Sequence, residues 1–169
     1  TGGHSKIASV VPQWFTLPHQ INATLPNIVA NDTAYFGMRA VQFFLPGEPQ
    51  VYYVGLFNGM DDRELFAKSG QGRDTNRHNY TVAEIQDALE QPVPRAIIAL
   101  ARLRKHAAFE GLFSWAVTGS NSIELRWDND DDFVSLEITT SVDAPAICIK
   151  ASSASGVREF CSVEEFAAY

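Results

Sequence analysis

The spacing of apolar residues along the chain changes near Gly111. Before this glycine, apolar residues recur at the spacing of helices, and after it apolar and polar residues alternate one by one. Alternation predicts strands that bury one face, and the polar, turn-rich connections between them predict hairpins. The alternating runs cover residues 113–115, 123–127, 134–138, 147–149 and 157–162. We therefore predict a small antiparallel β-domain over residues 111–169.

Helices are predicted at three main places in residues 1–110. The segment Asn31–Leu45 is apolar over most of its circumference, which is typical of a helix buried on several sides, and the Pro-Gly pair that follows ends it. Thr81 and Glu84 form a capping box that begins a second helix. Pro94 lies in the first turn of a third helix, where the missing N–H costs little.

One strand is predicted in this helical part, at residues 50–55. Its core, Val-Tyr-Tyr-Val, does not alternate apolar with polar residues. A continuous apolar run of this length favours a strand buried on both faces, as in a parallel sheet covered by helices. Such a strand needs parallel neighbours, and the sequence offers no second strand of this kind. We therefore expect the rest of that sheet to lie outside this chain or to come from another one.

The overall composition narrows the classes of partner. The formal net charge is −7 over 169 residues, which disfavours a nucleic-acid partner because such proteins usually present a basic face. No apolar run approaches the length of about 18 residues that a membrane-spanning helix needs. The first residues lack both an initiating Met and the basic start and apolar core of a signal peptide. We expect a chain that begins inside a longer one and interacts with no membrane.

The two cysteines, Cys148 and Cys161, both lie in apolar, strand-like patterns. This pattern predicts buried, reduced thiols in a cytoplasmic protein. A disulfide between adjacent strands is the alternative. No spacing of cysteines or histidines is typical of a zinc site, so the sequence predicts no metal ion.

A polar segment, Gly70–His78, follows the predicted strand at its C-terminal end, where α/β folds build their sites. Arg73 offers a forked set of donors and Asp74 could orient it. The pair could hold sugar hydroxyls or an anion, or it could be an ion pair that fixes a long loop. His19 and Gln20 lie in a second stretch where aromatic and amide residues mix, which suits a sugar ring or a loop anchored by aromatic side chains.

Other candidate sites are weaker. The acidic cluster at residues 128–132 lacks the alternating ligands, central glycine and final glutamate of an EF-hand, so a hairpin turn is the better interpretation. The sequence contains no GxSxG, P-loop or GxGxxG motif, and no pair of carboxylates in a context that suits acid–base catalysis. It therefore predicts neither a cofactor nor a catalytic residue within this chain.

Four strings resemble a known family: MRAVQFFLPGEPQVYYVGL, GRDTNRHNY, TVAEI and PVPRAIIALARLRKHAAFEGLFSW. They are similar to strings of the sucrose phosphorylases and related glucoside phosphorylases of glycoside hydrolase family 13, the α-amylase family. The resemblance covers about residues 13–140 and fades after that. It implies a (β/α)₈ barrel followed by a C-terminal β-domain. This chain would hold helix 7, strand 8 and helix 8 of the TIM barrel in residues 1–110, and the antiparallel β-domain in residues 111–169.

The resemblance also implies an activity. The family phosphorolyses an α-glucoside with retention, using an Asp nucleophile, a Glu acid and a third Asp that would all precede residue 1. Arg73, the Arg of GRD, would bind the glucosyl unit, and Gln20 would match the Gln of the family's YQVN segment. The expected partners are an α-glucoside and inorganic phosphate in the cytoplasm, and a homodimer of the full enzyme stays open.

One departure from the family pattern concerns the acceptor. Where the family typically reads LDLYQVN, this chain reads FTLPHQIN, so Leu17, Pro18 and His19 replace an Asp-Leu-Tyr run. This puts sucrose in doubt and brings in fructose 6-phosphate, glycerol or glycerate as acceptors, since His19 suits an anion or a small polyol. Two other readings are a hydrolase of the same family and a non-catalytic carbohydrate-binding or interaction module.

Overall fold

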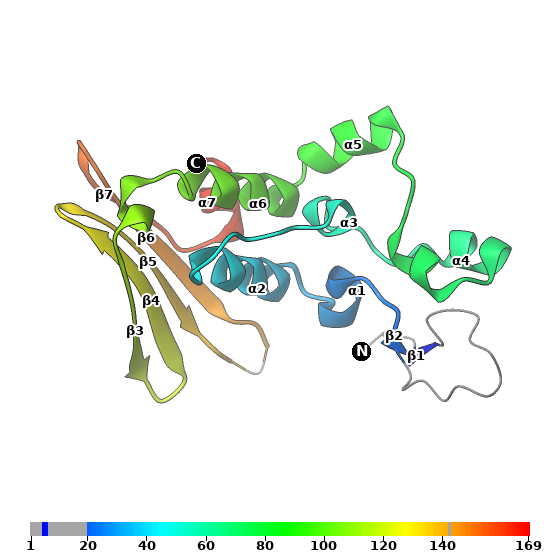
Figure 1. Ribbon diagram of the computed structural model, residues 1–169, viewed down its shortest axis with the longest axis horizontal. Helices are drawn as coiled ribbons and strands as arrows, with labels where there is room; N and C mark the ends of the chain where they lie inside the picture. The colour runs from blue at the N-terminus through cyan, green and yellow to red at the C-terminus, as the bar shows by residue number, and fades with distance from the viewer. Residues whose placement is uncertain (1–4, 7–19, 142) are drawn as a thin grey trace. The chain divides into compact units, whose positions relative to one another are not determined.

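The computed structural model describes residues 5–6, 20–141 and 143–169. Contacts within the chain form two compact units: unit 1 holds residues 1–30 and 51–89, and unit 2 holds residues 31–50 and 90–169. Figure 1 shows the elements of both. Two long helices from the first part of the sequence belong to unit 2, so the units do not follow the expected boundary after residue 110. That boundary concerns the domains of the resembled family and stays a prediction.

Unit 2 contains the five-stranded antiparallel sheet that the alternating pattern predicted. The strands pair in chain order, so the sheet is a simple meander, visible in Figure 1. They are β3 (Leu112–Gly119), β4 (Ser122–Asn129), β5 (Asp132–Thr139), β6 (Ala146–Ser153) and β7 (Gly156–Phe160). The acidic cluster forms the β4–β5 hairpin turn, where Asp130 takes a left-handed conformation with φ of 51°.

The register of the sheet explains its buried face. Leu125 on β4 pairs with Leu136 on β5, and Leu136 pairs with Ile149 on β6, so the three side chains line one face. All three are buried. Their chain neighbours point to the opposite face, because successive side chains of a strand alternate.

Helices of unit 2 cover that buried face. α2 (Asp32–Phe44) lies against β4, β5 and β6, and α6 (Pro92–Leu103) packs on α2 and on α7 (Val163–Ala167). A short 3-10 helix, η2 (Ala107–Glu110), leads into β3. α2 begins as predicted, since the Asn31 side chain accepts a hydrogen bond from the Ala34 N–H at 2.8 Å. At its other end the Trp127 indole N–H donates to the Phe44 carbonyl at 2.6 Å, which satisfies a carbonyl that the helix itself leaves unpaired.

Unit 1 is built from short elements joined by polar contacts. Its described elements are β1 (Ser5–Lys6), β2 (Gln20–Ile21), α1 (Leu25–Val29), α3 (Tyr53–Leu56), α4 (Arg63–Ser69), η1 (Gly72–Asn76) and α5 (Val82–Leu89). β1 and β2 pair antiparallel. The capping box of α5 forms as predicted, because the Glu84 carboxylate accepts from the Thr81 N–H at 2.7 Å and the Thr81 hydroxyl accepts from the Glu84 N–H at 3.3 Å.

The strand predicted at residues 50–55 is wrong. These residues end in the helical turn α3, and Tyr52 and Tyr53 are 51% and 36% exposed rather than buried on both faces. Among the residues described, no parallel strand lies beside them, so a strand here would leave its backbone groups unpaired. The turn satisfies them locally: the Leu56 N–H donates to the Tyr52 carbonyl at 3.0 Å and the Gly59 N–H to the Val54 carbonyl at 2.8 Å.

The prediction of two buried, reduced thiols is also wrong, because Cys148 and Cys161 form a disulfide. Cys148 alternates with the buried Ile147 and Ile149, and therefore points to the solvent face of β6. Ile149 pairs with Phe160, so Cys161 follows as the next residue opposite Cys148, with 4.2 Å between the Cα atoms. The alternative named from the sequence, a disulfide between neighbouring strands, is the one that the structure contains.

Reducing this disulfide is expected to lower the free energy of unfolding of unit 2 by about 3 kcal/mol. The cross-link closes a short loop, with a sequence separation of 13, and so limits the freedom of the unfolded chain. Urea unfolding with and without a reductant measures the difference. The Cys148→Ser/Cys161→Ser double variant is the control, since its unfolding midpoint should not respond to reductant. Equal midpoints for the wild-type chain under both conditions would contradict a stabilising disulfide.

Candidate functional site

The candidate site lies in unit 1, in the polar stretch that follows α3. Its first fixed point is Asp62, whose carboxylate accepts from the Leu65 N–H at 2.8 Å and so caps the start of α4. The Asp62 N–H in turn donates to the carbonyl of Thr75 at 2.8 Å. This backbone bond joins the start of α4 to η1, the short helix that carries Arg73 and Asp74.

Arg73 and Asp74 lie side by side on η1, as the sequence suggested. Their side chains form a long ion pair, with 4.0 Å between the Arg73 Nε and the Asp74 Oδ1. The Arg73 side chain is 58% exposed and that of Asp74 20% exposed, whereas the neighbouring Gly72 and Thr75 are buried. Because an exposed pair at this distance contributes little to stability, the arrangement leaves the Arg73 guanidinium available to a ligand.

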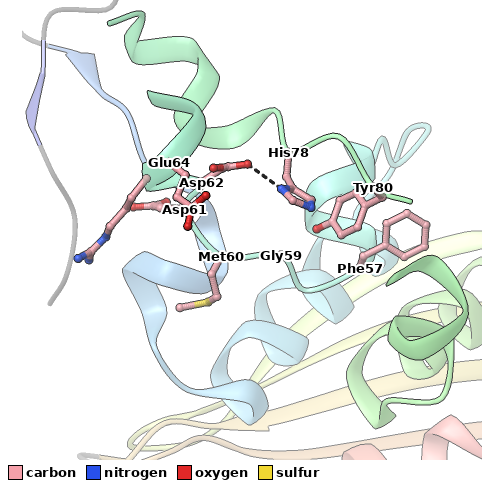
Figure 2. A pocket seen from close by; sticks show the side chains of 9 residues that line it. Phe57, Gly59, Met60, Asp61, Asp62, Glu64, His78 and Tyr80 are labelled. Atoms are coloured by element: carbon pink, nitrogen blue, oxygen red, sulfur yellow. Dashed lines mark hydrogen bonds and ion pairs between the residues drawn. The ribbon is translucent and has the colours of Figure 1, made fainter. Parts of the chain in front are cut away.

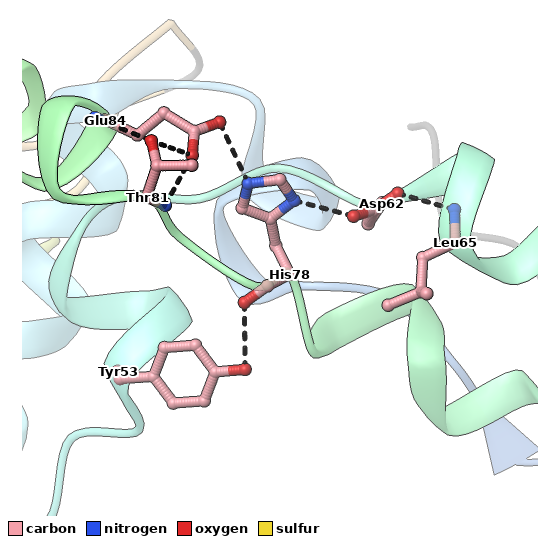
Figure 3. A network of polar contacts seen from close by, with 6 residues as sticks. All are labelled: Tyr53, Asp62, Leu65, His78, Thr81 and Glu84. Carbon is pink, nitrogen blue, oxygen red and sulfur yellow. Dashed lines mark hydrogen bonds and ion pairs between the residues drawn. The ribbon is translucent and has the colours of Figure 1, made fainter.

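His78 connects the two helices on either side of this segment, as Figure 3 shows. Its Nδ1 lies 2.6 Å from the Asp62 Oδ2, and its Nε2 lies 3.2 Å from the Glu84 Oε1. The Tyr53 hydroxyl donates to the His78 carbonyl at 3.0 Å. We call the three side chains of Asp62, His78 and Glu84 the His78 clamp.

The clamp shifts the pKa of each of its members. The pKa of His78 is raised above its ordinary value, chiefly by the hydrogen bond to Asp62. Burial, the next largest effect, opposes this rise, and the hydrogen bond to Glu84 adds to it. The pKa of Asp62 is lowered, chiefly by the hydrogen bond from the Leu65 N–H and then by His78. The pKa of Glu84 is lowered, chiefly by the hydrogen bonds from Thr81. All three shifts favour the charged forms of the side chains.

A hollow of about 610 Å³ opens beside the clamp. Figure 2 shows its lining: Phe57 and Tyr80 on one side, Asp61, Asp62 and Glu64 on the other, and His78 between them. The ring of Tyr80 meets those of Phe57 and His78 edge to face, with 5.1 and 4.6 Å between centroids. Aromatic rings beside carboxylates form a surface that suits a sugar, because ring C–H groups stack on the aromatic faces and hydroxyls donate to the acids.

Close backbone approach keeps one position in this lining free of a side chain. A Cβ added at Gly59 would meet the Tyr80 hydroxyl and would lie 2.8 Å from the Val54 Cγ1 and 3.0 Å from the Val54 carbonyl oxygen. On the other side of the hollow, the Asp61 Oδ1 accepts from the Thr24 N–H at 2.6 Å. This bond joins the acidic wall to the segment that follows Gln20.

The residues chosen from the sequence are therefore brought together only in part. Arg73 and Asp74 are neighbours on η1, Gln20 lies in β2, and His19 lies outside the described residues. The sequence indicated Glu84 only as part of a capping box, and it assigned neither Asp61 nor Asp62 to a site. The spacing of a histidine between two capping acids is the signal that could have identified the clamp.

Two further observations concern ligands and membranes. Within the described part of the chain, Cys148, Glu159 and Cys161 are the one group of three metal-ligating side chains that lie close together, and its two sulfurs are joined in the disulfide. No helix among the described residues is both long and apolar enough to cross a membrane.

The sequence of this chain is similar to those of two sucrose phosphorylases. The chain is 48% identical over 111 residues to the sucrose phosphorylase of Bifidobacterium adolescentis, which covers 64% of this chain and 22% of that protein. It is 42% identical over 144 residues to the sucrose phosphorylase of Agrobacterium vitis, which covers 84% of this chain and 28% of that protein. The chain thus spans about a quarter of the length of these relatives. No family model matches it.

A solved structure extends the similarity to the fold. The sucrose 6F-phosphate phosphorylase of Thermoanaerobacter thermosaccharolyticum superposes with a TM-score of 0.81 at 32% sequence identity. The superposition covers 95% of this chain and 34% of that one. Both units of this chain therefore have counterparts in a phosphorylase.

Proposed function

We propose that this chain, a homologue of the sucrose phosphorylases and their relatives, is the C-terminal portion of a retaining glucoside phosphorylase. The complete enzyme would transfer the glucosyl unit of sucrose or a related α-glucoside to inorganic phosphate, giving α-glucose 1-phosphate and the free acceptor. The observation that carries the proposal is the similarity to two sucrose phosphorylases at 42% and 48% identity, supported by the superposition on a third phosphorylase.

The proposal assigns residues 1–110 to the end of a TIM barrel and residues 111–169 to the C-terminal β-domain. The order of elements supports the barrel assignment. The apolar residues 50–55 lie between α2 and α6 in the sequence, as the segment between helices 7 and 8 of a barrel would.

Within the proposed site, Arg73 holds the glucosyl unit and Asp74 orients the guanidinium. The exposure of Arg73 and the length of its pairing with Asp74 support this role, because its donors are free to turn toward a sugar. Gln20 and His19 are assigned to the substrate side of the same site. The catalytic carboxylates would lie in the part of the enzyme that precedes this chain, and a cytoplasmic location belongs to the proposal as well.

A chimera tests the proposal. Residues 1–169 would replace the corresponding segment of the Agrobacterium vitis enzyme, to which the chain is 42% identical over 144 aligned residues. We expect the purified chimera to release glucose 1-phosphate from an α-glucoside in a phosphate-dependent reaction, whereas residues 1–169 alone release none. Sucrose, sucrose 6F-phosphate and glucosylglycerol would be assayed in parallel, since the acceptor is open.

The controls separate the remaining alternatives. The Agrobacterium vitis enzyme without the segment should be inactive, and the parent enzyme sets the full rate. Release of glucose at a rate independent of phosphate would favour a hydrolase instead. Release of glucose 1-phosphate by residues 1–169 alone would overturn the assignment of the catalytic groups to the rest of the enzyme.

A further inference from the structure

The geometry of the His78 clamp demands two donors on one imidazole ring. Each ring nitrogen faces a carboxylate oxygen, at 2.6 Å for Asp62 and 3.2 Å for Glu84. An ionised carboxylate only accepts hydrogen bonds, and a neutral imidazole carries a single N–H. The arrangement is therefore complete only when His78 is an imidazolium.

Both carboxylates of the clamp are themselves fixed at helix starts, as Figure 3 shows. The Asp62 Oδ1 accepts from the Leu65 N–H in the first turn of α4, and the Glu84 Oε2 accepts from the N–H and the hydroxyl of Thr81 before α5. The imidazolium thus joins the N-termini of two helices. The chain between them contains η1, and so the clamp closes the loop on which Arg73 lies.

Two more hydrogen bonds connect the clamp to the backbone around η1. The Asp62 N–H donates to the carbonyl of Thr75, two residues from Arg73, at 2.8 Å. At the far end of the loop, the His78 carbonyl accepts from the Tyr53 hydroxyl at 3.0 Å. A movement of Asp62 or His78 would therefore displace the backbone beside Arg73.

We propose that His78 is a positioning residue, which as an imidazolium holds the starts of α4 and α5 together and thereby fixes the segment that carries Arg73. The kinetic consequence rests on the proposed function, whereas the structural consequence does not. The role needs no contact between His78 and substrate, because His78 acts through the backbone of η1.

The stability of the clamp should depend on pH, and the charged groups around His78 decide whether it rises or falls with pH. Asp62 at the N-cap of α4, Glu84 on α5 and the nearly perpendicular Tyr80 ring face the imidazole, and Lys68 on α4 acts on Asp62. Because the pKa of His78 is raised, its stabilising effect is complete below the ordinary histidine value and is lost as pH rises through the raised value. Because the pKa of Asp62 is lowered, its effect is lost only as pH falls through that depressed value.

Nuclear magnetic resonance of the 169-residue chain gives the structural test. We expect the His78 ring to titrate above an ordinary histidine, and the backbone amides of Arg73 and Asp74 to shift with the same midpoint. In His78→Gln and His78→Arg these amides should no longer follow that titration. Glu84→Gln should lower the His78 midpoint. Asp87→Asn is the matched control, since it removes an exposed acid from the same helix and should leave the midpoint unchanged.

Kinetics in the chimera give the functional test, as the ratio of kcat/KM between variant and parent across the pH range. His78→Gln should lower kcat/KM about 10- to 100-fold at acidic to neutral pH, because a misplaced binding group is costly. The ratio should return towards one as pH rises and the parent loses its own clamp. His78→Arg keeps two-sided donation at every pH, so its ratio should exceed one at alkaline pH.

The outcomes separate this inference from the proposed function. Amides of Arg73 and Asp74 that ignore the His78 titration would overturn it, as would a His78 midpoint at or below the ordinary value. A His78→Gln to parent ratio that stays constant with pH would also overturn it, because packing alone has no such dependence. An inactive chimera would count against the proposed function only, since the resonance test needs no turnover. If His78→Gln does not fold, His78→Arg and Glu84→Gln still decide both tests.

Discussion

Replacing Arg73 by alanine in the chimera is expected to lower kcat/KM for phosphorolysis by about 100- to 1,000-fold. The guanidinium of Arg73 is 58% exposed and pairs with Asp74 only at 4.0 Å, so the substitution removes little that the fold depends on. In the proposed site its forked donors hold the glucosyl unit while charge develops at the sugar, and no other residue of η1 offers such donors. Initial rates with saturating phosphate and varied α-glucoside measure the loss.

Two further variants serve as controls for Arg73→Ala. Arg95→Ala removes an exposed arginine from α6 in unit 2, and it should leave both the rate and the melting temperature unchanged. Arg73→Lys keeps the charge but not the planar fork, so it should recover only part of the lost rate. A rate for Arg73→Ala within about threefold of the parent would contradict the assigned role, since even one donor to a transition state is worth more than that.

The β-sheet and the helix caps could be predicted because their signals are local. The alternation along β4 and β5 follows from the pleat of each strand and does not depend on which strand pairs with it. The observed register places the apolar residues of the two strands on the same face. The capping box at Thr81 and Glu84 likewise depends on residues within one turn. Both signals are properties of a few neighbouring residues, so one sequence is enough to read them.

Two predictions are wrong because residues far away in the sequence decide the local structure. The apolar run at residues 50–55 suits a strand only if parallel neighbours exist, and without them in the described residues the backbone pairs with itself in a helical turn. Cys148 lies between two isoleucines, which suggested that its side chain is buried. Alternation along β6 places it on the opposite face from these isoleucines, and the pairing of β6 with β7 brings it to Cys161. Neither outcome follows from composition alone.

The candidate site could likewise be predicted only in part, because it also depends on residues that are distant in the sequence. The GRD string drew attention to Arg73 and Asp74, which do lie together on η1. The sequence indicated Glu84 only as part of a capping box and did not single out Asp62. Their common partner, His78, is separated from Asp62 by 16 residues and from Glu84 by 6 residues, so no local pattern connects the three. In related sequences, a histidine between two acids that each begin a helix is the pattern that would indicate such a clamp.

Truncation of Phe44 to alanine is expected to lower the free energy of unfolding of unit 2 by about 3–5 kcal/mol. The side chain is fully buried, with 0% exposure, and its ring meets that of Phe109 edge to face at 5.5 Å. Alanine would leave a cavity between α2 and η2, and the backbone carbonyl that accepts from Trp127 would lose the packing that holds it in place. Urea unfolding followed by tryptophan fluorescence reports on this region, because Trp127 is part of it.

The neighbouring residue supplies the matched control. Leu45 is also large and apolar, but it is 44% exposed, and its N–H donates to the Val41 carbonyl at 3.0 Å through the backbone alone. Leu45→Ala should therefore cost no more than about 0.5–1 kcal/mol, as is usual at a half-exposed surface position. The contrast depends on burial and not on hydrophobicity, which the two residues share. Equal losses for the two variants would mean that α2 does not bury Phe44 against η2, and would contradict the described core of unit 2.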